Sequence, residues 1–585
     1  VGRGKREAQP PGRQVPVDRH EGRAEGVARR IRIGRAEIEV PDHYVRAAPR
    51  HPDAGYKALL SDFDSNRKAA LEAIKNPPAI KPEDRARIEA LAKTPPDFVA
   101  NALFYDALLK TEAGNFGPAA EGFAAFIVQF PKHLLIEEAR LRQAFCFLEN
   151  RNAAEAIKLL QPLQAHPKLA DRAMWWLARA QFSADPNNVP AFEQAAKAAC
   201  DLFAKAADKA SEFAKTDPDA KVRRGDILLE LGDTQAAARL YKEAAATYAN
   251  VFDEKSSPER AEEALQRQAT ALHLAAHYKE SEEICHKFEQ TYPKSTLLAE
   301  VWFRSAENAC LLAVDAASGP KAAETRADWE KKFDDAITRY KRLLAQYPEF
   351  QTANLARYGM ATAQYQRGSY RDAISSLNAI LDADRNGDLA PVNAVLADCL
   401  IRLMPAETND ALQAGSVLDK AERAIKFLDK YLSAVGKAPQ GADTLLKLGY
   451  CYQRIGTLLI NPAEKQKNLT LAKQMYEKLF QEFPASSSFA AAVLERAYCI
   501  AQLGDPNGAI HEYARFTGDP LQKSPVAPLA FIRQAELLRS QNRAPDAVNT
   551  MAQCRTRFEA LLQKDPQRSD WVPTLLYEQA LAIKD

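Results

Sequence analysis

A small residue followed twelve positions later by a proline recurs in one register along this chain. The step joins Ala119 to Pro131, Ser281 to Pro293, Ala336 to Pro348 and Ala472 to Pro484, and each proline follows Phe or Tyr. Proline lacks an amide N–H and disfavours helix in the residue before it, so each proline marks the end of a helix. Four occurrences in one register indicate repeated units, which constrain the fold more than composition does.

The repeated positions have a mechanical reason. A small residue lets the second helix of a hairpin approach its partner closely, and a larger side chain four residues on fills the space beside it. The small residues are Ala119, Ala156, Ala199, Ala237, Ser281, Ala336, Ala373, Ala424, Ala472, Ala509 and Ala547. The larger ones are Phe123, Leu160, Phe203, Tyr241, Cys285, Tyr340, Leu377, Leu428, Tyr476, Tyr513 and Met551.

The turns and the first helices fit the same register. A Gly or Asn five residues before the small residue supplies a tight turn at Gly114, Gly232, Gly368, Gly504 and Asn542. The first helices carry their own small residue at Ala107, Ala144, Ala178, Gly225, Ala269, Ala306, Ala361, Ala397, Gly449, Ala497 and Ala535. Extra residues at Asp315–Trp329, Met404–Val417 and Asn461–Leu469 predict surface insertions inside hairpins. The sequence therefore predicts an all-α fold, an α-solenoid of about eleven helical hairpins with insertions.

Three regions are expected along the chain. Residues 1–52 are rich in Arg, Gly and Pro, which predicts a disordered basic tail. One interpretation of this tail is an arm that binds nucleic acid or a membrane surface; because the chain opens with Val, a wrongly chosen start codon is an equally open one. Residues 53–96 form an N-terminal helical segment with short helices at 56–75 and 82–93. Residues 97–585 form the solenoid, which ends in a capping helix at Leu575–Lys584.

Charge and cysteine usage exclude several classes of protein. A net charge of only +2 does not indicate a nucleic-acid partner. The chain has neither a run of about 18 apolar residues for a transmembrane segment nor the apolar core of a signal peptide. The eight cysteines lie far apart without a C-x-x-C pair, which indicates small buried side chains. We therefore favour a cytoplasmic location for the chain as written over the periplasm or cell envelope.

These positions resemble the tetratricopeptide repeat (TPR) family. The resemblance is carried by Leu445, Gly449 and Tyr452 in one unit, by Trp302 and Ala306 in another, and by Gly368–Ala373 in a third. The ending Ala-x3-Phe/Tyr-x6-Phe/Tyr-Pro is similar to that of bacterial outer-membrane assembly lipoproteins of the BamD kind and of the envelope protein YbgF, which works with the Tol-Pal system. The resemblance covers about residues 97–585 and implies a right-handed superhelix.

The same resemblance implies that the first helices line a concave groove that holds a peptide or protein segment. The groove candidates are Asn101, Phe104, Leu108, Leu141, Phe145, Leu148, Tyr358, Thr362, Tyr365, Leu494, Tyr498 and Gln502. For each of them the alternative is the core between repeats. Aromatic and amide side chains suit extended or helical peptides, and the lack of a Lys/Arg ladder argues against a carboxylate clamp.

One loop copies the first half of an EF-hand. Asp382, Asp384 and Asn386 occupy ligand positions 1, 3 and 5, and Gly387 occupies the turn at position 6. Position 12 is Asn393 instead of the bidentate Glu, and Asp, Asn and Gly also suit an ordinary turn. We therefore expect no metal site and keep this loop only as a calcium candidate.

Motifs for catalysis are missing from the sequence. His273 and His277 have the spacing with which two imidazoles share a metal, near Cys285 and His286. However, no Glu follows His273, so the H-E-x-x-H pattern fails, and Cys285 occupies a packing position. Neither G-x-S-x-G nor a phosphate-binding Gly loop occurs, so we expect no enzyme activity and no cofactor.

The sequence thus predicts a protein–protein interaction scaffold that binds a peptide or protein segment in the groove of a TPR superhelix. The alternative is a cell-envelope component that acts in outer-membrane assembly or beside Tol-Pal.

Overall fold

The computed structural model describes residues 31–33, 36–38, 52–75, 86, 89, 97–182, 189–255, 257–319, 325–405, 407–408, 410–565 and 568–585. It divides into two compact units, Val1–Ala271 and Leu272–Asp585. A short antiparallel hairpin, β1 (Ile31–Ile33) and β2 (Ala36–Ile38), pairs Ile31 with Ile38. The rest of the expected tail, and nearly all of the helix expected at 82–93, lie outside the described residues.

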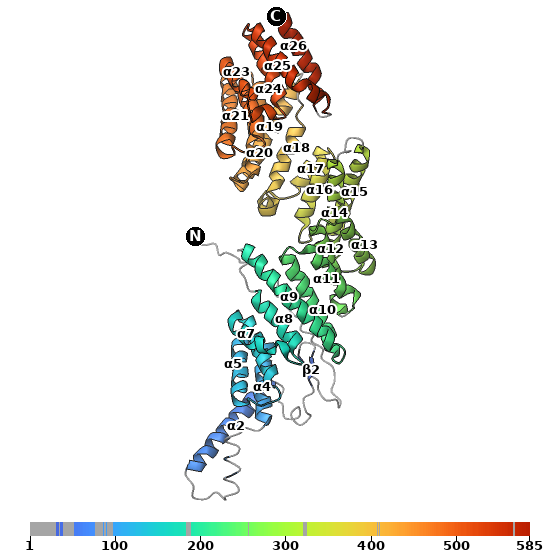
Figure 1. Ribbon diagram of the computed structural model, residues 1–585, viewed down its shortest axis with the longest axis vertical. Helices are drawn as coiled ribbons and strands as arrows, with labels where there is room; N and C mark the ends of the chain where they lie inside the picture. Colours follow the sequence, from blue (N-terminus) through green and yellow to red (C-terminus); the bar gives the residue numbers. More distant parts are fainter. Residues whose placement is uncertain are drawn as a thin grey trace. The chain divides into compact units, whose positions relative to one another are not determined.

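Unit 1 is a stack of helices in chain order (Figure 1). Its helices are α2 (Pro52–Lys75), α4 (Asp97–Glu112), α5 (Phe116–Gln129), α6 (Ile136–Glu149), α7 (Ala153–Leu160), α8 (Ala170–Gln181), α9 (Val189–Phe213), α10 (Pro218–Ala237), α11 (Tyr241–Asp253) and most of α12 (Ala261–Leu274). Each helix from α4 to α10 packs against the next, and α6 also contacts α4 and α8. The even-numbered helices from α4 to α24 are called first helices below, and the odd-numbered helices from α5 to α25 second helices.

Unit 2 continues with the same alternation of first and second helices. Its helices are α13 (Tyr278–Thr291), α14 (Leu298–Ser318), α15 (Arg326–Gln346), α16 (Ala353–Gln366), α17 (Tyr370–Asn378), α18 (Pro391–Arg402), α19 (Ala411–Val435), α20 (Gln440–Leu458), α21 (Pro462–Glu482), α22 (Phe489–Gln502), α23 (Pro506–Ala514), α24 (Ala527–Ser540), α25 (Ala544–Gln563) and α26 (Trp571–Lys584). Each packs against its successor. The predicted all-α fold is confirmed, and α26 packs on α24 and α25 where the capping helix was expected. The count of eleven repeats stays a prediction.

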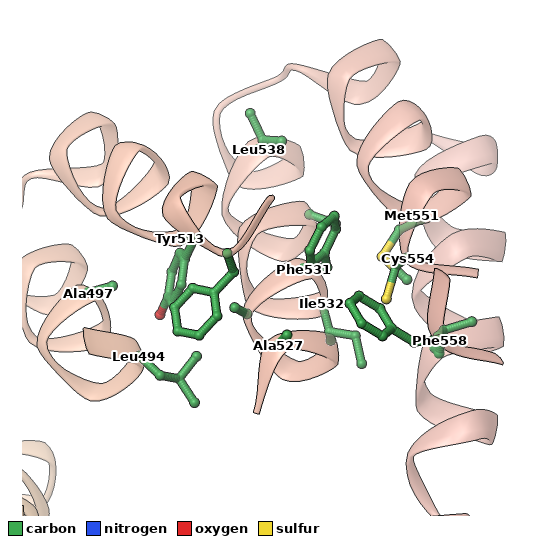
Figure 2. Packing of buried hydrophobic residues seen from close by; sticks show 14 of the residues in the cluster. Leu494, Ala497, Tyr513, Ala527, Phe531, Ile532, Leu538, Met551, Cys554 and Phe558 are labelled. Carbon is green, nitrogen blue, oxygen red and sulfur yellow. The ribbon is translucent and has the colours of Figure 1, made fainter. Parts of the chain in front are cut away.

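The contact between small and large residues forms the core. The predicted small residues of the second helices are 0% exposed, except Ala237, and the predicted larger residues are at most 3% exposed, except Tyr241. Figure 2 shows the last two hairpins, where Phe531 on α24 lies between Tyr513 on α23 and Met551 on α25. Burial of such side chains is worth about 1.5–3 kcal/mol each, so this contact supplies much of the stability of each hairpin.

The aromatic residue before each repeated proline ends a second helix in one geometry. Phe130, Tyr292, Tyr347 and Phe483 have φ between −127° and −136° and ψ between 55° and 68°. Each donates its backbone N–H to the carbonyl four residues earlier at 2.8–2.9 Å. The proline that follows then leaves the helical path, as the sequence predicted.

In one hairpin, that of α10 and α11, the predicted register is wrong. Gly114, Gly368, Gly504 and Asn542 have the positive φ expected of turn residues, but Gly232 lies inside α10, and the turn residue is Arg239 with φ 59°. The buried small residue of α11 is Ala244 and the larger one Tyr248, whereas Ala237 and Tyr241 are only partly buried. Gly232, not Gly225, is the glycine on which the Tyr248 ring rests.

The segments predicted as surface insertions are partly helical where the structure describes them. Helices α15, α19 and α21 begin within the segments that were expected to be surface insertions and run for 21, 25 and 21 residues. In α21 the Asn461 side chain accepts hydrogen bonds from the backbone N–H groups of Ala463 at 2.9 Å and Glu464 at 3.4 Å, and Pro462 opens the helix. This N-cap stabilises an early start, so the extra residues lengthen the second helix.

Candidate functional site

The groove candidates fall into two groups by burial. Phe104, Leu108, Leu141 and Leu494 are at most 2% exposed and belong to the hydrophobic clusters between helices. They form the core, which was the alternative for these positions. The candidates Asn101, Phe145, Leu148, Tyr358, Thr362, Tyr365 and Tyr498 are half-buried, and Gln502 is exposed. Only this second group has side-chain surface that a partner can contact.

Two tyrosines on the first helices of unit 2 lie beside cationic side chains. Tyr365 on α16 lies beside Arg402 on α18, and the interaction of its hydroxyl with the guanidinium is the main cause that raises the pKa of Arg402. The Arg533 guanidinium on α24 lies over the Tyr498 ring at 5.5 Å from its centroid. Burial raises the pKa of the Tyr498 hydroxyl, which therefore stays protonated at neutral pH. Each tyrosine presents a half-exposed ring and a hydroxyl that can donate a hydrogen bond.

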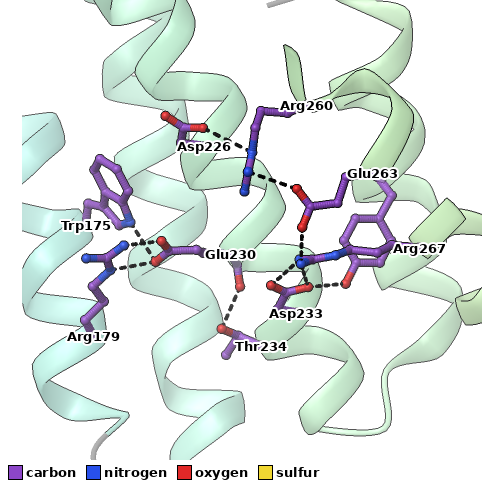
Figure 3. A network of polar contacts seen from close by, with 10 residues as sticks. Trp175, Arg179, Asp226, Glu230, Asp233, Thr234, Arg260, Glu263 and Arg267 are labelled. Atoms are coloured by element: carbon purple, nitrogen blue, oxygen red, sulfur yellow. Dashed lines mark hydrogen bonds and ion pairs between the residues drawn. The ribbon is translucent and has the colours of Figure 1, made fainter. Parts of the chain in front are cut away.

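The first helices of unit 1 are joined instead by a charged network (Figure 3). Trp175 Nε1 on α8 donates to Glu230 Oε2 on α10 at 2.8 Å, and Arg179 Nε donates to the same oxygen at 2.7 Å. A second nitrogen of Arg179 is bonded to the other carboxylate oxygen, and its guanidinium carbon lies 4.8 Å from the centroid of the Trp175 ring. This two-pronged pair fixes α8 relative to α10.

A second part of the network joins α10 to α12. Arg267 on α12 pairs with Asp233 on α10 and with Glu263 one turn earlier on its own helix. The Tyr248 hydroxyl donates to Asp233 Oδ1 at 2.7 Å, and Arg260 lies 3.0 Å from Glu263. Because the carboxylates of this network have cationic partners, this stretch of first helices presents little uncompensated charge.

Sequence reasoning missed these paired residues, although a signal exists. Asp226, Glu230 and Asp233 follow the spacing i, i+4, i+7 on one first helix. Arg260, directly before the next first helix, and Arg267 on that helix lie seven residues apart. Residues at that spacing share a helix face. Opposite charges on the facing sides of successive first helices therefore indicate inter-helix ion pairs.

The calcium candidate loop is occupied by contacts within the protein. Lys430 Nζ lies 2.8 and 2.7 Å from the two carboxylate oxygens of Asp382, and this bond lowers the pKa of that carboxyl. Asp384 accepts a hydrogen bond from Asn354 at 3.2 Å, and Asn386 donates to the Ala383 carbonyl. Within the described residues no group of three or more His, Cys, Asp or Glu side chains has the geometry of a metal site.

The two histidines considered as metal ligands have separate partners. His273 Nδ1 lies 2.7 Å from Asn308 Oδ1, and Asn308 Nδ2 donates to Ser281 Oγ at 2.8 Å. His277 contacts Glu280 at 3.3 Å. All eight cysteines are buried with free thiols, and burial raises the pKa of Cys285 to about 12, so this thiol is not a reactive nucleophile.

We expect His273 to make the stability of unit 2 depend on pH. Burial, with the nearby Arg304 charge, lowers its pKa from 6.5 to about 4. Between those values the unfolded chain binds the proton and the folded chain does not, so stability falls as the pH drops from 6.5 to 4. Urea denaturation at a series of pH values tests this. Between pH 6.5 and 4 the free energy of unfolding of the wild type should fall relative to that of His273→Gln. Carboxylates such as Glu307 titrate in both proteins, so parallel pH curves would contradict this assignment.

The arrangement of paired helices is that of a helical repeat protein. Two family models, both described as tetratricopeptide repeat, match residues 330–401 and 443–486. The chain therefore contains tetratricopeptide repeats, which are commonly scaffolds for protein–protein interaction and are generally not enzymes. No curated protein matches the chain. None of the described helices is long and apolar enough to cross a bilayer.

The solved structures similar to this chain include the following two. One is the APC/C hetero-tetramer Cut9–Hcn1, with 15% identity, a TM-score of 0.26, and coverage of 89% of this chain and 98% of that chain. The other is a tetratricopeptide repeat protein from Parabacteroides merdae, with 11% identity, a TM-score of 0.30, and coverage of 54% and 98%. Similarity at these TM-scores carries no conclusion about function.

Proposed function

We propose that the chain is a scaffold that holds a peptide or protein segment along its first helices and catalyses no reaction. The observation that carries the proposal is a set of half-buried aromatic rings at the predicted groove positions of the first helices. The second helices bury Tyr340, Tyr476 and Tyr513, which occupy the large position of the repeat, to no more than 2% exposure. The first helices keep half-exposed aromatic rings at Phe145, Tyr365 and Tyr498.

Half-exposed aromatic side chains suit a protein partner. A ring held by its neighbours loses little entropy on binding, and aromatic residues that become fully buried in an interface each contribute about 2 kcal/mol or more. Phe145 is held by Trp176 at 5.0 Å and by Phe116 at 6.1 Å between ring centroids, and Tyr365 by Tyr370 at 5.4 Å. Nucleic acid is not among the proposed partners, because the charged residues on these helices are largely paired.

Site-specific photo-crosslinking tests the proposal. We expect p-benzoylphenylalanine in place of Tyr365 or Tyr498 to capture segments of the same partner in cells. The matched controls are Arg423 and Lys473, which lie on second helices and are 45% and 38% exposed. Capture from the control positions alone would contradict binding along the first helices.

A second candidate is a cell-envelope component in outer-membrane assembly or beside Tol-Pal. Its support is the helix ending shared by Phe130, Tyr292, Tyr347 and Phe483, each followed by proline. Fractionation of the native protein tests it, because recovery from the cytosol would exclude an envelope location.

A further inference from the structure

A cleft of about 280 Å³ opens between the second helices α13 and α15 of unit 2, with α14 as its floor. It is lined by Cys285, His286, Glu289, Val301, Trp302, Ser305, Asp335, Thr338, Arg339 and Arg342. None of these residues is among the first-helix candidates, so the cleft is separate from the surface of the proposed function.

The repeat pattern explains why this space exists. In most second helices the position four residues after the small residue carries Phe, Tyr, Leu or Met, whereas α13 carries Cys285. A thiol fills much less volume than the rings of Tyr340 or Tyr476 at the same position. The missing volume lies beside the Trp302 indole, whose Nε1 is buried without a hydrogen-bond partner.

An arginine of the chain itself lies on that indole. The Arg342 guanidinium carbon is 3.7 Å from the centroid of the Trp302 ring, and its nitrogen is 2.7 Å from Glu289 Oε1. An aromatic face with a carboxylate at its edge is the combination that recognises a guanidinium by cation–π attraction and charge-assisted hydrogen bonds. The position of Arg342 therefore indicates that the site accepts a guanidinium group.

The pair formed by Arg342 can be exchanged at low cost. The Arg342 and Glu289 side chains are 59% and 31% exposed, and ion pairs of this kind contribute about 0–1 kcal/mol. The other arginine of the cleft, Arg339, is held by Glu282, by Asp335 at 2.9 Å and by Ser305 at 2.6 Å. Once Arg342 swings out, the carboxylates of Glu282, Glu289 and Asp335 face Arg339 and the His286 ring, whose Nε2 lies 3.1 Å from Glu282 Oε1. Three carboxylates beside one arginine and one imidazole favour an incoming cation.

We infer that the cleft between α13 and α15 binds an arginine side chain of a partner protein, which takes the place of Arg342 on Trp302 and pairs with Glu289. The cleft is too small for a drug-sized ligand and large enough for one side chain.

N-acetyl-arginine amide is the probe for this inference. The full chain is labelled with 5-fluorotryptophan, and the Trp302 signal in the ¹⁹F NMR spectrum is assigned with Trp302→Phe. We expect saturable shifts of that signal, with a Kd about tenfold lower in Arg342→Ala than in the wild type because the internal competitor is gone. If Arg342→Ala lowers stability, Arg342→Met keeps the alkyl stem and gives the same comparison.

Three controls make the test specific. N-acetyl-citrulline amide has the same shape without the charge and should not bind, and Glu289→Gln should weaken arginine binding. Lys341→Ala removes a neighbouring exposed charge on α15 outside the cleft and should behave like the wild type. Absence of saturation in Arg342→Ala, or equal affinity for the arginine and citrulline probes, would overturn the inference.

Discussion

Replacing Tyr476 with alanine is expected to destabilise unit 2 by about 3–5 kcal/mol, the cost of removing a large buried ring. Tyr476 on α21 is 0% exposed and packs in a cluster with Leu445 and Leu448 of α20. Its ring rests on Gly449, so the backbone of α20 is too close for neighbouring side chains to fill the space. Urea denaturation followed by circular dichroism measures the loss.

Two variants separate the parts of this effect. Tyr476→Phe removes only the hydroxyl, which donates to Gln453 Oε1 at 2.9 Å, and should cost about 1–2 kcal/mol because that buried acceptor loses its main donor. Tyr577→Ala, at a tyrosine that is 62% exposed on α26, should stay within about 0.5 kcal/mol of the wild type. If Tyr476→Ala behaved like Tyr577→Ala, the small-to-large contact would not be the basis of hairpin stability.

The contact between small and large residues also explains which parts of the fold could be predicted. A residue such as Ala472 beside Tyr476 fits only one arrangement of two close helices, so its spacing identifies the hairpin. In the hairpin of α10 and α11, two pairs of small residues have the twelve-residue spacing that the register requires. They are Gly225 with Ala237 and Gly232 with Ala244. The two solutions differ by seven residues, nearly two helical turns, and therefore place the same face inward. Tertiary packing of Tyr248 decides between them.

The candidate site was less predictable than the fold. Phe104 and Tyr498 both lie on inward-facing positions of first helices, yet one is 2% exposed and the other is half-buried. The difference in exposure depends on the neighbouring side chains. Phe104 packs against Phe123 and Phe126, at 5.6 and 5.7 Å between ring centroids, whereas the Arg533 guanidinium lies over the Tyr498 ring. A helix pattern gives the direction of a side chain but not the size of what covers it.

The corrected register of α10 makes its own prediction. Gly232→Ala should destabilise unit 1 by about 1–3 kcal/mol, because the added Cβ would lie 2.7 Å from Tyr248 Cζ. The ring cannot move away easily, since it is 3% exposed and its hydroxyl is bonded to Asp233 at 2.7 Å. Under the register first predicted, Gly232 is a turn residue and the Tyr248 ring does not cover it.

Gly415→Ala is the matched control for this substitution. Gly415 is exposed in α19, and an added Cβ meets nothing within 4 Å, so alanine should stabilise that helix by about 0.5–1 kcal/mol. The two substitutions therefore have the same chemistry and opposite expected signs in urea denaturation. Combining Gly232→Ala with Tyr248→Leu should cost less than the sum of the single changes, because a smaller side chain leaves room for the new methyl group. Additive costs would show that Tyr248 is not what Gly232 accommodates.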